Sequence, residues 1–350
     1  MKRLIASLLC LLLLASSAAA METTGETIPY WSASSPAMAS IMDFVASVTD
    51  EASDSYLPPE KRIAVFDSDG TLYGELFPTY FDQCLLMHRL LHDDTYEGLP
   101  EDVAYCQALE DHLLRGGEKP KSSKSSAQMC AEAFRGFTVE EYQAYIRDFM
   151  KQPAWGFENL TYEDGFYKPM AALVQYLAEH GFQVYIVSGA ERLMLRELNR
   201  GILDAWITPS RVLGSVFSLT APGQGDTAAR DYTYAPEDRV ILEGNMIFKN
   251  LKMNKVVSIV QEIGIPPVLA FGNSSGDLAM GEYTVQNGGK AYMLLCDDTV
   301  RDYGNLETAE KFRKQCEQLG FETVSMRDEF ETIYGEDVIM TGTEALEPAA

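Results

Sequence analysis

Two aspartates, Asp67 and Asp69, stand directly after the apolar run 63–66 and just before Gly70. An unbroken apolar run between turn residues is typical of a parallel strand that is covered on both faces. At the end of such a strand both carboxylates can face one site, because Gly70 lets the chain turn. Two acids this close repel each other unless a cation lies between them or one takes up a proton. The pair therefore predicts a cation-binding reactive site, and the alternative is an acidic turn that caps the next helix.

Three other apolar runs also end in polar residues. They are 184–187 before Ser188-Gly189, 268–271 before Gly272-Asn273, and 291–295 before Cys296-Asp297-Asp298. Helical patterns lie between the runs, at 169–180 before Gly181 and at 255–263 before Gly264. This alternation predicts an α/β fold with a Rossmann-like, doubly wound parallel sheet. Since ligands bind at the carboxyl ends of the strands in such sheets, the four polar clusters should form one site.

These elements, in this order, resemble the motifs of the haloacid dehalogenase superfamily. The D-x-D-G-T sequence from Asp67 to Thr71 is similar to the first motif, Ser188 to the second, and the loop from Gly272 to Asp277 to the fourth. The resemblance covers most of residues 61 to 300. The helical insertion after the first motif resembles the C1-capped phosphatases related to phosphoserine phosphatase, and exported acid and phosphorylcholine phosphatases look most similar.

The resemblance implies a role for each matched residue. Asp67 would be the nucleophile that forms an aspartyl-phosphate, and Asp69 would be the general acid and base. Thr71, Ser188 and Gly189 would bind the substrate, with Ser188 and nearby backbone N–H groups on the phosphoryl oxygens. This activity is hydrolysis of a small phosphomonoester, with phosphorylcholine or phosphoserine as examples. The alternatives are a phosphotransferase on the same core and a non-catalytic binding protein.

The catalytic lysine and one of the metal ligands have two candidates each. The lysine is Lys252 or Lys255, and we favour Lys252 because its spacing to Gly264 fits the gapless helix of the phosphoserine phosphatase relatives. Magnesium would bind Asp67, the backbone carbonyl of Asp69 and a group from the fourth motif. Asn273 stands there where many members have Asp, so either Asn273 or Asp277 is the ligand.

The N-terminus predicts export. Lys2 and Arg3 precede an apolar run and the small residues 16–20, as in a secretory signal peptide of bacterial type, so we expect a periplasmic or secreted protein. No later stretch is long and apolar enough to span a bilayer, so no membrane contact is expected after cleavage. The net charge of −24 disfavours nucleic acid and anionic lipid as partners. An anionic small-molecule substrate then needs a bound cation at the site.

The expected domain organisation has five parts. They are a signal peptide (1–20), an N-terminal leader and helix (21–60), an α/β core (61–76 and 160–335), a helical cap insertion (77–159) and a disordered acidic tail (336–350). The leader up to about residue 35 is polar and is expected to be flexible. Five cysteines remain after cleavage, which allows at most two disulfides. The sequence indicates neither their pairing nor the oligomeric state.

Overall fold

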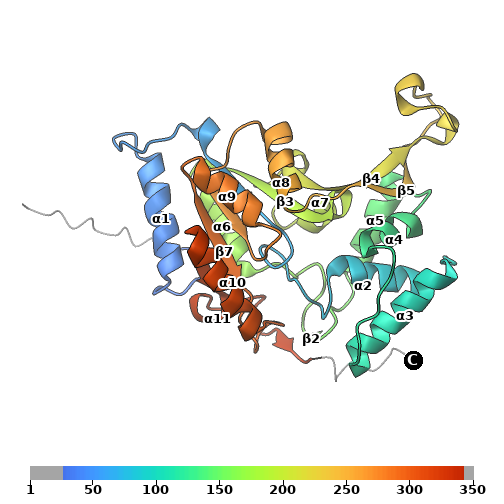
Figure 1. Ribbon diagram of the computed structural model, residues 1–350, viewed down its shortest axis with the longest axis horizontal. Coiled ribbons are helices and arrows are strands. Elements are labelled where there is room, and N and C mark those ends of the chain that lie inside the picture. The colour runs from blue at the N-terminus through green and yellow to red at the C-terminus, as the bar shows by residue number, and fades with distance from the viewer. Residues whose placement is uncertain (1–26, 343–350) are drawn as a thin grey trace, which may run out of the picture.

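The computed structural model describes residues 27–342, and within them the core is a seven-stranded sheet (Figure 1). The strand order is β5-β4-β3-β1-β6-β7-β8, and each neighbouring pair is parallel except β4 with β5. This arrangement confirms the predicted doubly wound α/β fold. The strands are β1 (Ile63–Phe66), β3 (Gln183–Glu191), β4 (Val212–Thr220), β5 (Ile241–Phe248), β6 (Leu269–Gly272), β7 (Lys290–Leu295) and β8 (Glu322–Ser325).

Helices cover both faces of this sheet, and the alternation of side chains along β1 shows why. Ala64 and Phe66 point into one apolar layer, and Ile63 and Val65 point into the other. The first layer is closed by α1 (Pro36–Thr49), α6 (Lys168–Glu179) and α7 (Arg192–Asn199). The second is closed by α9 (Leu278–Gln286), α10 (Leu306–Leu319) and the turn that follows α8 (Met253–Ser258). Both faces of β1 are therefore dry, as its continuous apolar run requires.

The carboxyl end of β1 is the switch point of the sheet. The chain builds outward from β1 through β3 and β4 on one side, and through β6, β7 and β8 on the other. Stacked rings hold the centre together, with Phe66 of β1 and Phe271 of β6 4.3 Å apart between centroids. Ligands of doubly wound sheets bind at such a point, because the adjoining loops diverge there and leave a crevice.

The insertion between β1 and β3 forms a helical cap at one end of the sheet (Figure 1). Backbone hydrogen bonds join it to the antiparallel edge strand β5. Gly136 N–H donates to the Leu242 carbonyl at 2.9 Å, and Leu242 N–H donates to the Phe137 carbonyl at 2.8 Å. The cap is thus an extension of the sheet edge as well as an insertion after β1. Its helices are α2 (Phe81–Met87), α3 (Pro100–Arg115), α4 (Ser126–Ala133) and α5 (Val139–Met150).

Both chain ends of the described region are more ordered than predicted. Trp31, expected in a flexible leader, is buried, and its indole N–H donates to the Pro169 carbonyl at 2.8 Å. The tail was expected to be disordered from residue 336, but β9 (Ile339–Met340) pairs with β2 (Phe157–Glu158) at the end of the cap. Isolated apolar residues in polar segments gave too weak a signal for either contact. The predicted signal peptide and residues 343–350 lie outside the described region.

Three strands of the seven-stranded sheet were not predicted, namely β4, β5 and β8. Gly214 and Gly244 interrupt the apolar patterns of β4 and β5, and β8 is a short strand before α11 (Met326–Glu329).

Between residues 27 and 342, no helix has the length and apolar character of a membrane span. The five cysteines in that range, Cys84, Cys106, Cys130, Cys296 and Cys316, are all free thiols.

Candidate active site

The loop after β1 places Asp67 at the end of the sheet. Asp67 N–H still donates to the Phe271 carbonyl of β6 at 2.9 Å, so its backbone continues the strand ladder. The Ser68 carbonyl then accepts hydrogen bonds from the N–H groups of Thr71, Leu72 and Tyr73, which closes a tight turn. Gly70 adopts a φ of +74° within this turn, a conformation that L side chains rarely adopt. The turn leaves the carboxylates of Asp67 and Asp69 in the same pocket.

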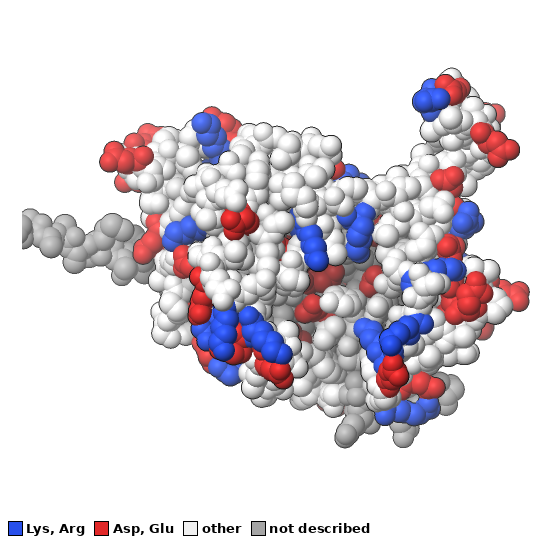
Figure 2. Space-filling view, in the orientation of Figure 1, with Lys and Arg blue, Asp and Glu red and all other residues white. Residues whose placement is uncertain are grey.

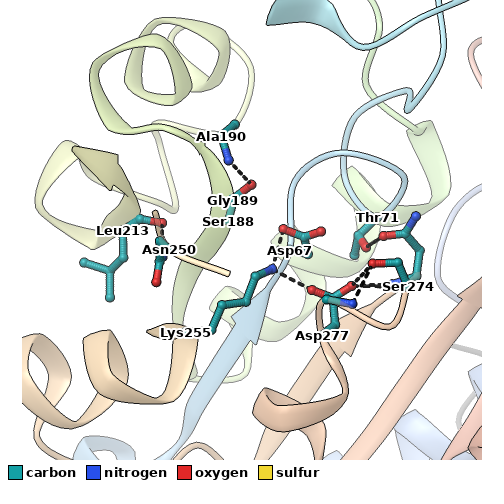
Figure 3. Close-up of polar contacts among 12 residues, drawn as sticks. Asp67, Thr71, Ser188, Gly189, Ala190, Leu213, Asn250, Lys255, Ser274 and Asp277 are labelled. Atoms are coloured by element: carbon teal, nitrogen blue, oxygen red, sulfur yellow. Dashed lines mark hydrogen bonds and ion pairs between the residues drawn. The ribbon is translucent and has the colours of Figure 1, made fainter. Parts of the chain in front are cut away.

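A buried lysine binds two of the predicted acids (Figure 3). The Nζ atom of Lys255 lies 2.7 Å from Asp67 Oδ1 and 2.5 Å from Asp277 Oδ1. Lys255 is 1% exposed, and a buried ammonium is stable only when it is paired in this way. The structure therefore brings together a strand end, the start of α8 and the loop after β6.

The preference for Lys252 over Lys255 was wrong. Lys252 is exposed at the residue that precedes α8, with a φ of +55°, and it does not line the pocket. Lys255 lies in the first turn of α8 and points at Asp67. The spacing to Gly264 misled because the helix does not run regularly to that glycine. It changes to a wider turn over Ile259–Ile263, which uses more residues per turn than the assumed helix.

Asp277 organises the loop after β6 and does not reach outward as a free ligand. Its Oδ2 accepts hydrogen bonds from the backbone N–H groups of Asn273 and Ser274, both at 3.1 Å. Its Oδ1 is held by Lys255, so both carboxylate oxygens have protein donors. Asn273 Oδ1, by contrast, accepts only from the Thr71 hydroxyl, at 3.3 Å. Of the two candidates, Asn273 is therefore the one with an oxygen suited to a metal, and Asp277 positions it.

Thr71 helps to position Asn273 and does not line the pocket. Its side chain is fully buried, and its hydroxyl donates to Asn273. The sequence predicted substrate binding for Thr71 along with Ser188 and Gly189. The structure instead places the Thr71 side chain inside the protein, where it links the loops after β1 and β6.

Ser188 and Gly189 lie where the pairing of β3 with β4 is irregular, beside Asp67 (Figure 3). The Ser188 hydroxyl accepts a hydrogen bond from Ala190 N–H at 3.2 Å. The Gly189 carbonyl accepts two, from Ser215 Oγ at 2.6 Å and from Lys249 Nζ at 2.8 Å. These bonds fix the direction of the peptide that follows Gly189, so Gly189 and Ala190 line the pocket beside Asp67.

The pocket has a volume of about 280 Å³ and lies between the sheet and the cap. Figure 2 shows it as a hollow with acidic side chains in its floor and basic side chains on its rim. The sequence interpretation missed several lining residues, among them Lys249, which follows β5, and Asp82 and Ser126 from the cap. An alternating pattern over 241–248 would have located Lys249. The two cap residues carry no motif, and only the fold brings them here.

Burial and mutual repulsion shift the protonation of the two motif aspartates. Burial, aided by the Asp277 carboxylate, raises the pKa of Asp67 to about 6 even though Lys255 opposes this shift. Burial, followed by the charge of Asp67, raises the pKa of Asp69 well above its usual range. Burial alone would lower the pKa of Lys255, but Asp277 and Asp67 raise it above its ordinary value, so this side chain stays charged.

The donor set at the pocket floor fits magnesium. The Asp67 carboxylate, the Asp69 backbone carbonyl and the Asn273 amide oxygen are hard oxygen donors, which Mg²⁺ prefers. The pocket lining also carries more negative than positive charge, since only Lys249 and Lys255 offset five carboxylates. A divalent cation would reduce this excess. In residues 27–342 no three His, Cys, Asp or Glu side chains form a metal cluster.

Among the solved structures that are similar to this chain, one reaches a TM-score of 0.50 and supports this fold. A protein of unknown function from Anaerococcus prevotii DSM 20548 has a TM-score of 0.50 and 15% identity, over 83% of this chain and 91% of that one. Cytosolic 5'-nucleotidase IIIB bound to cytidine has a TM-score of 0.46 and 12% identity, over 85% of this chain and 86% of that one. A phosphoserine phosphohydrolase-like protein from Francisella tularensis subsp. tularensis SCHU S4 has a TM-score of 0.36 and 13% identity, over 67% of this chain and 87% of that one. No curated protein matches the sequence.

The family comparison covers both the fold and the site. The matched segment, residues 64–282, begins in β1 and ends in α9, so it includes Asp67, Ser188, Lys255 and Asp277. Because the family model spans more than half of the sequence, this chain belongs to the haloacid dehalogenase-like hydrolases.

Proposed function

We propose that the protein is an exported, Mg²⁺-dependent phosphomonoesterase that uses Asp67 as its nucleophile. One observation carries this proposal. The Asp67 carboxylate lies at the carboxyl end of β1, lines an open pocket and is held at one oxygen by the Lys255 ammonium. An oriented carboxylate beside a fixed positive charge is arranged to attack an electrophile that carries negative charge, as a phosphoryl group does.

The reaction needs two displacements at phosphorus. Asp67 attacks the phosphorus atom, and the bond to the leaving oxygen breaks while Asp69 donates a proton to that oxygen. The product is an aspartyl-phosphate on Asp67. A water molecule then attacks this phosphorus, loses its proton to Asp69 and releases inorganic phosphate, which restores both aspartates.

The remaining residues hold the phosphoryl group and its charge. Lys255 attracts the phosphoryl oxygens while it keeps Asp67 in place. Gly189 lines the β3 side of the pocket, where its backbone can hydrogen-bond the other oxygens. Ser188 precedes it in β3 with a buried side chain outside the pocket lining, and we propose that its hydroxyl also binds a phosphoryl oxygen. Asp67, the Asp69 carbonyl and Asn273 would hold Mg²⁺, which when bound supplies positive charge that offsets the phosphoryl oxygens.

Export to the periplasm or the medium is part of the proposal, because residues 1–20 have the composition of a signal peptide. N-terminal sequencing of the protein recovered outside the cytoplasm should begin near Met21. We also propose a C1-type cap and a small phosphorylated metabolite as substrate, because the motifs and the helical insertion resemble those of the C1-capped phosphatases.

The deciding experiment compares the wild-type protein with Asp67→Asn in phosphate release from acetyl phosphate and aryl phosphates. We expect turnover in the wild type with magnesium, loss of turnover with chelator, and a rate at least about 10³-fold lower in the variant. Asp328→Asn, an exposed substitution away from the pocket, is the control. Unchanged turnover in Asp67→Asn would exclude the mechanism. Transfer of phosphate to an added alcohol, without release to water, would indicate a phosphotransferase.

A further inference from the structure

A second cavity adjoins the catalytic pocket and has no part in the proposed chemistry. Its volume is about 450 Å³, against about 280 Å³ for the catalytic pocket. Both are lined by Glu75, Tyr80, Asn273 and Ser274, so they meet at a common wall. We call the second cavity the α10 chamber, because side chains of α10 line the side away from this wall.

The common wall contains a hydrogen-bonded pair of side chains. The Tyr80 hydroxyl donates to Glu75 Oε1 at 2.9 Å, and Tyr80 is 37% exposed. Asn273 lies in the same wall, and its backbone follows β6 at the pocket floor. A molecule whose phosphorus lies against Asp67 can therefore extend past this wall into the adjoining chamber.

Three aromatic rings line the chamber. Tyr80, Tyr303 and Phe312 face it from the cap, from the loop after β7 and from α10. Tyr303 is fixed in place, since its hydroxyl donates to the Gly156 carbonyl at 3.3 Å and its ring packs edge-on against Phe157 at 5.5 Å. Rings that are already fixed lose little side-chain entropy when they bind another flat group.

The polar lining is mostly uncharged. Asn305, Thr308 and Gln315 offer amide and hydroxyl groups, which suit a ligand with hydroxyl, carbonyl or amine functions. The one lining cation, Lys311, has a 73% exposed side chain and is paired with Glu307 at 2.6 Å. No arginine lines the chamber. A second phosphate would thus find no buried positive charge, and a small ammonium group would fill only a fraction of the volume.

We infer that the α10 chamber binds the leaving group of the phosphomonoester, a flat and largely apolar group with hydrogen-bonding substituents and no second phosphate. The inference rests on the proposed phosphatase function and adds the substrate class. It also places specificity on the core helix α10 as well as on the cap.

The test compares three substrates and two chamber-filling variants, each with magnesium. The substrates are 1-naphthyl phosphate, phosphorylcholine and acetyl phosphate. The variants are Thr308→Tyr and Gln315→Trp, which add a ring at exposed chamber residues without changing the core. Glu317→Tyr adds the same bulk on the opposite face of α10 and is the matched control.

We expect the highest kcat/KM with 1-naphthyl phosphate, and a fall of about tenfold or more for this substrate in both variants, mainly through KM. Acetyl phosphate should be hydrolysed within about twofold of the wild-type rate by both variants and by the control. Equal effects on naphthyl and acetyl phosphate, or a preference for phosphorylcholine, would overturn the inference while leaving the phosphatase function intact. No turnover of any substrate by the wild type would overturn both.

Discussion

Gly70 and Asn273 interlock the loops that follow β1 and β6. A Cβ atom at residue 70 would lie 2.0 Å from Asn273 Nδ2, which is far inside van der Waals contact. The two residues are 203 positions apart in the sequence, yet their packing sets the relation between Asp67, the proposed nucleophile, and Asn273, the proposed metal ligand. The absence of a side chain at residue 70 is therefore as much a part of the site as the carboxylates.

Gly70→Ala should impair both folding and catalysis. The positive φ and the clash together should lower the free energy of unfolding by about 2–4 kcal/mol and reduce kcat/KM by at least about tenfold. Gly264→Ala is the control, because Gly264 has a nearly equal φ of +76° and open space around it. In this control the free energy of unfolding should fall by only about 1 kcal/mol, and the activity should be unchanged. Equal losses in the two variants, measured by urea unfolding, would contradict the interlock.

Lys255→Met should remove most of the activity. It takes away the ammonium that holds Asp67 and faces the phosphoryl group, so kcat should fall by about 10²–10³-fold. It also leaves Asp67 and Asp277 without their counter-charge, which should destabilise the fold by about 3–5 kcal/mol. Activity is therefore measured under conditions where circular dichroism shows a folded protein.

Lys252→Met also tests which of the two lysines is catalytic. Because Lys252 is exposed and outside the pocket, this variant should keep kcat within about twofold. A loss of activity in Lys252→Met that matches the loss in Lys255→Met would mean that the bound state differs from the geometry described.

Asn273→Asp should strengthen magnesium binding. The substitution keeps the shape of the side chain and its acceptor for the Thr71 hydroxyl, and it adds a negative charge to the donor set. We expect the dissociation constant for Mg²⁺ to fall by about tenfold in a calorimetric titration without substrate. Ser275→Asp, which adds the same charge in the same loop, serves as the control for long-range attraction. Similar gains in the two variants would argue against direct ligation by residue 273.

Asp302 should make stability depend on pH. Its buried carboxyl accepts hydrogen bonds from the hydroxyls of Tyr167 and Tyr334, both at 3.1 Å, and burial raises its pKa to about 7. In the unfolded chain an aspartate has a pKa of about 4. The folded state thus favours the protonated carboxyl. The contribution of Asp302 to the free energy of unfolding is therefore fully present below about pH 4 and is lost as the pH rises to about 7.

Asp302→Asn should remove this dependence, because the amide does not ionise. Between about pH 4 and 7, the difference between wild type and variant should change by about 1.4 kcal/mol per pH unit, with the wild type losing stability as the pH rises. Urea unfolding of both proteins at several pH values gives this difference directly, since titration of all other groups cancels. Parallel curves would show that Asp302 is ionised throughout in the folded protein.

The sequence was most informative where burial on two faces dictates composition. Residues 63–66 could be identified as a central strand because both of its faces need apolar side chains, and the acids that follow it then located the site. The edge strand β5 has one face open to solvent, so its polar residues concealed it. Lys249, which follows β5, was missed for the same reason.

Tertiary contacts explain the other differences between the sequence predictions and the structure. Lys252 and Lys255 have the same chemistry, and only the packing of α8 against the sheet decides which one reaches Asp67. The pairing of residues 339–340 with the end of the cap depends on backbone hydrogen bonds, which leave little trace in side-chain composition. Asp82 and Ser126 enter the pocket because of how the cap docks, a property that no local pattern encodes.

The hydrogen bonds between the cap and β5 also constrain how the chain is made. Residues 136–139 leave the ribosome about one hundred residues before their partners at 240–242, which corresponds to roughly 5 to 20 seconds of synthesis. Through that interval the nascent cap has no sheet edge to dock on, and its apolar helix faces stay open to chaperones. Translation speed over residues 140–240 is therefore expected to affect the yield of native protein more than speed elsewhere in the chain.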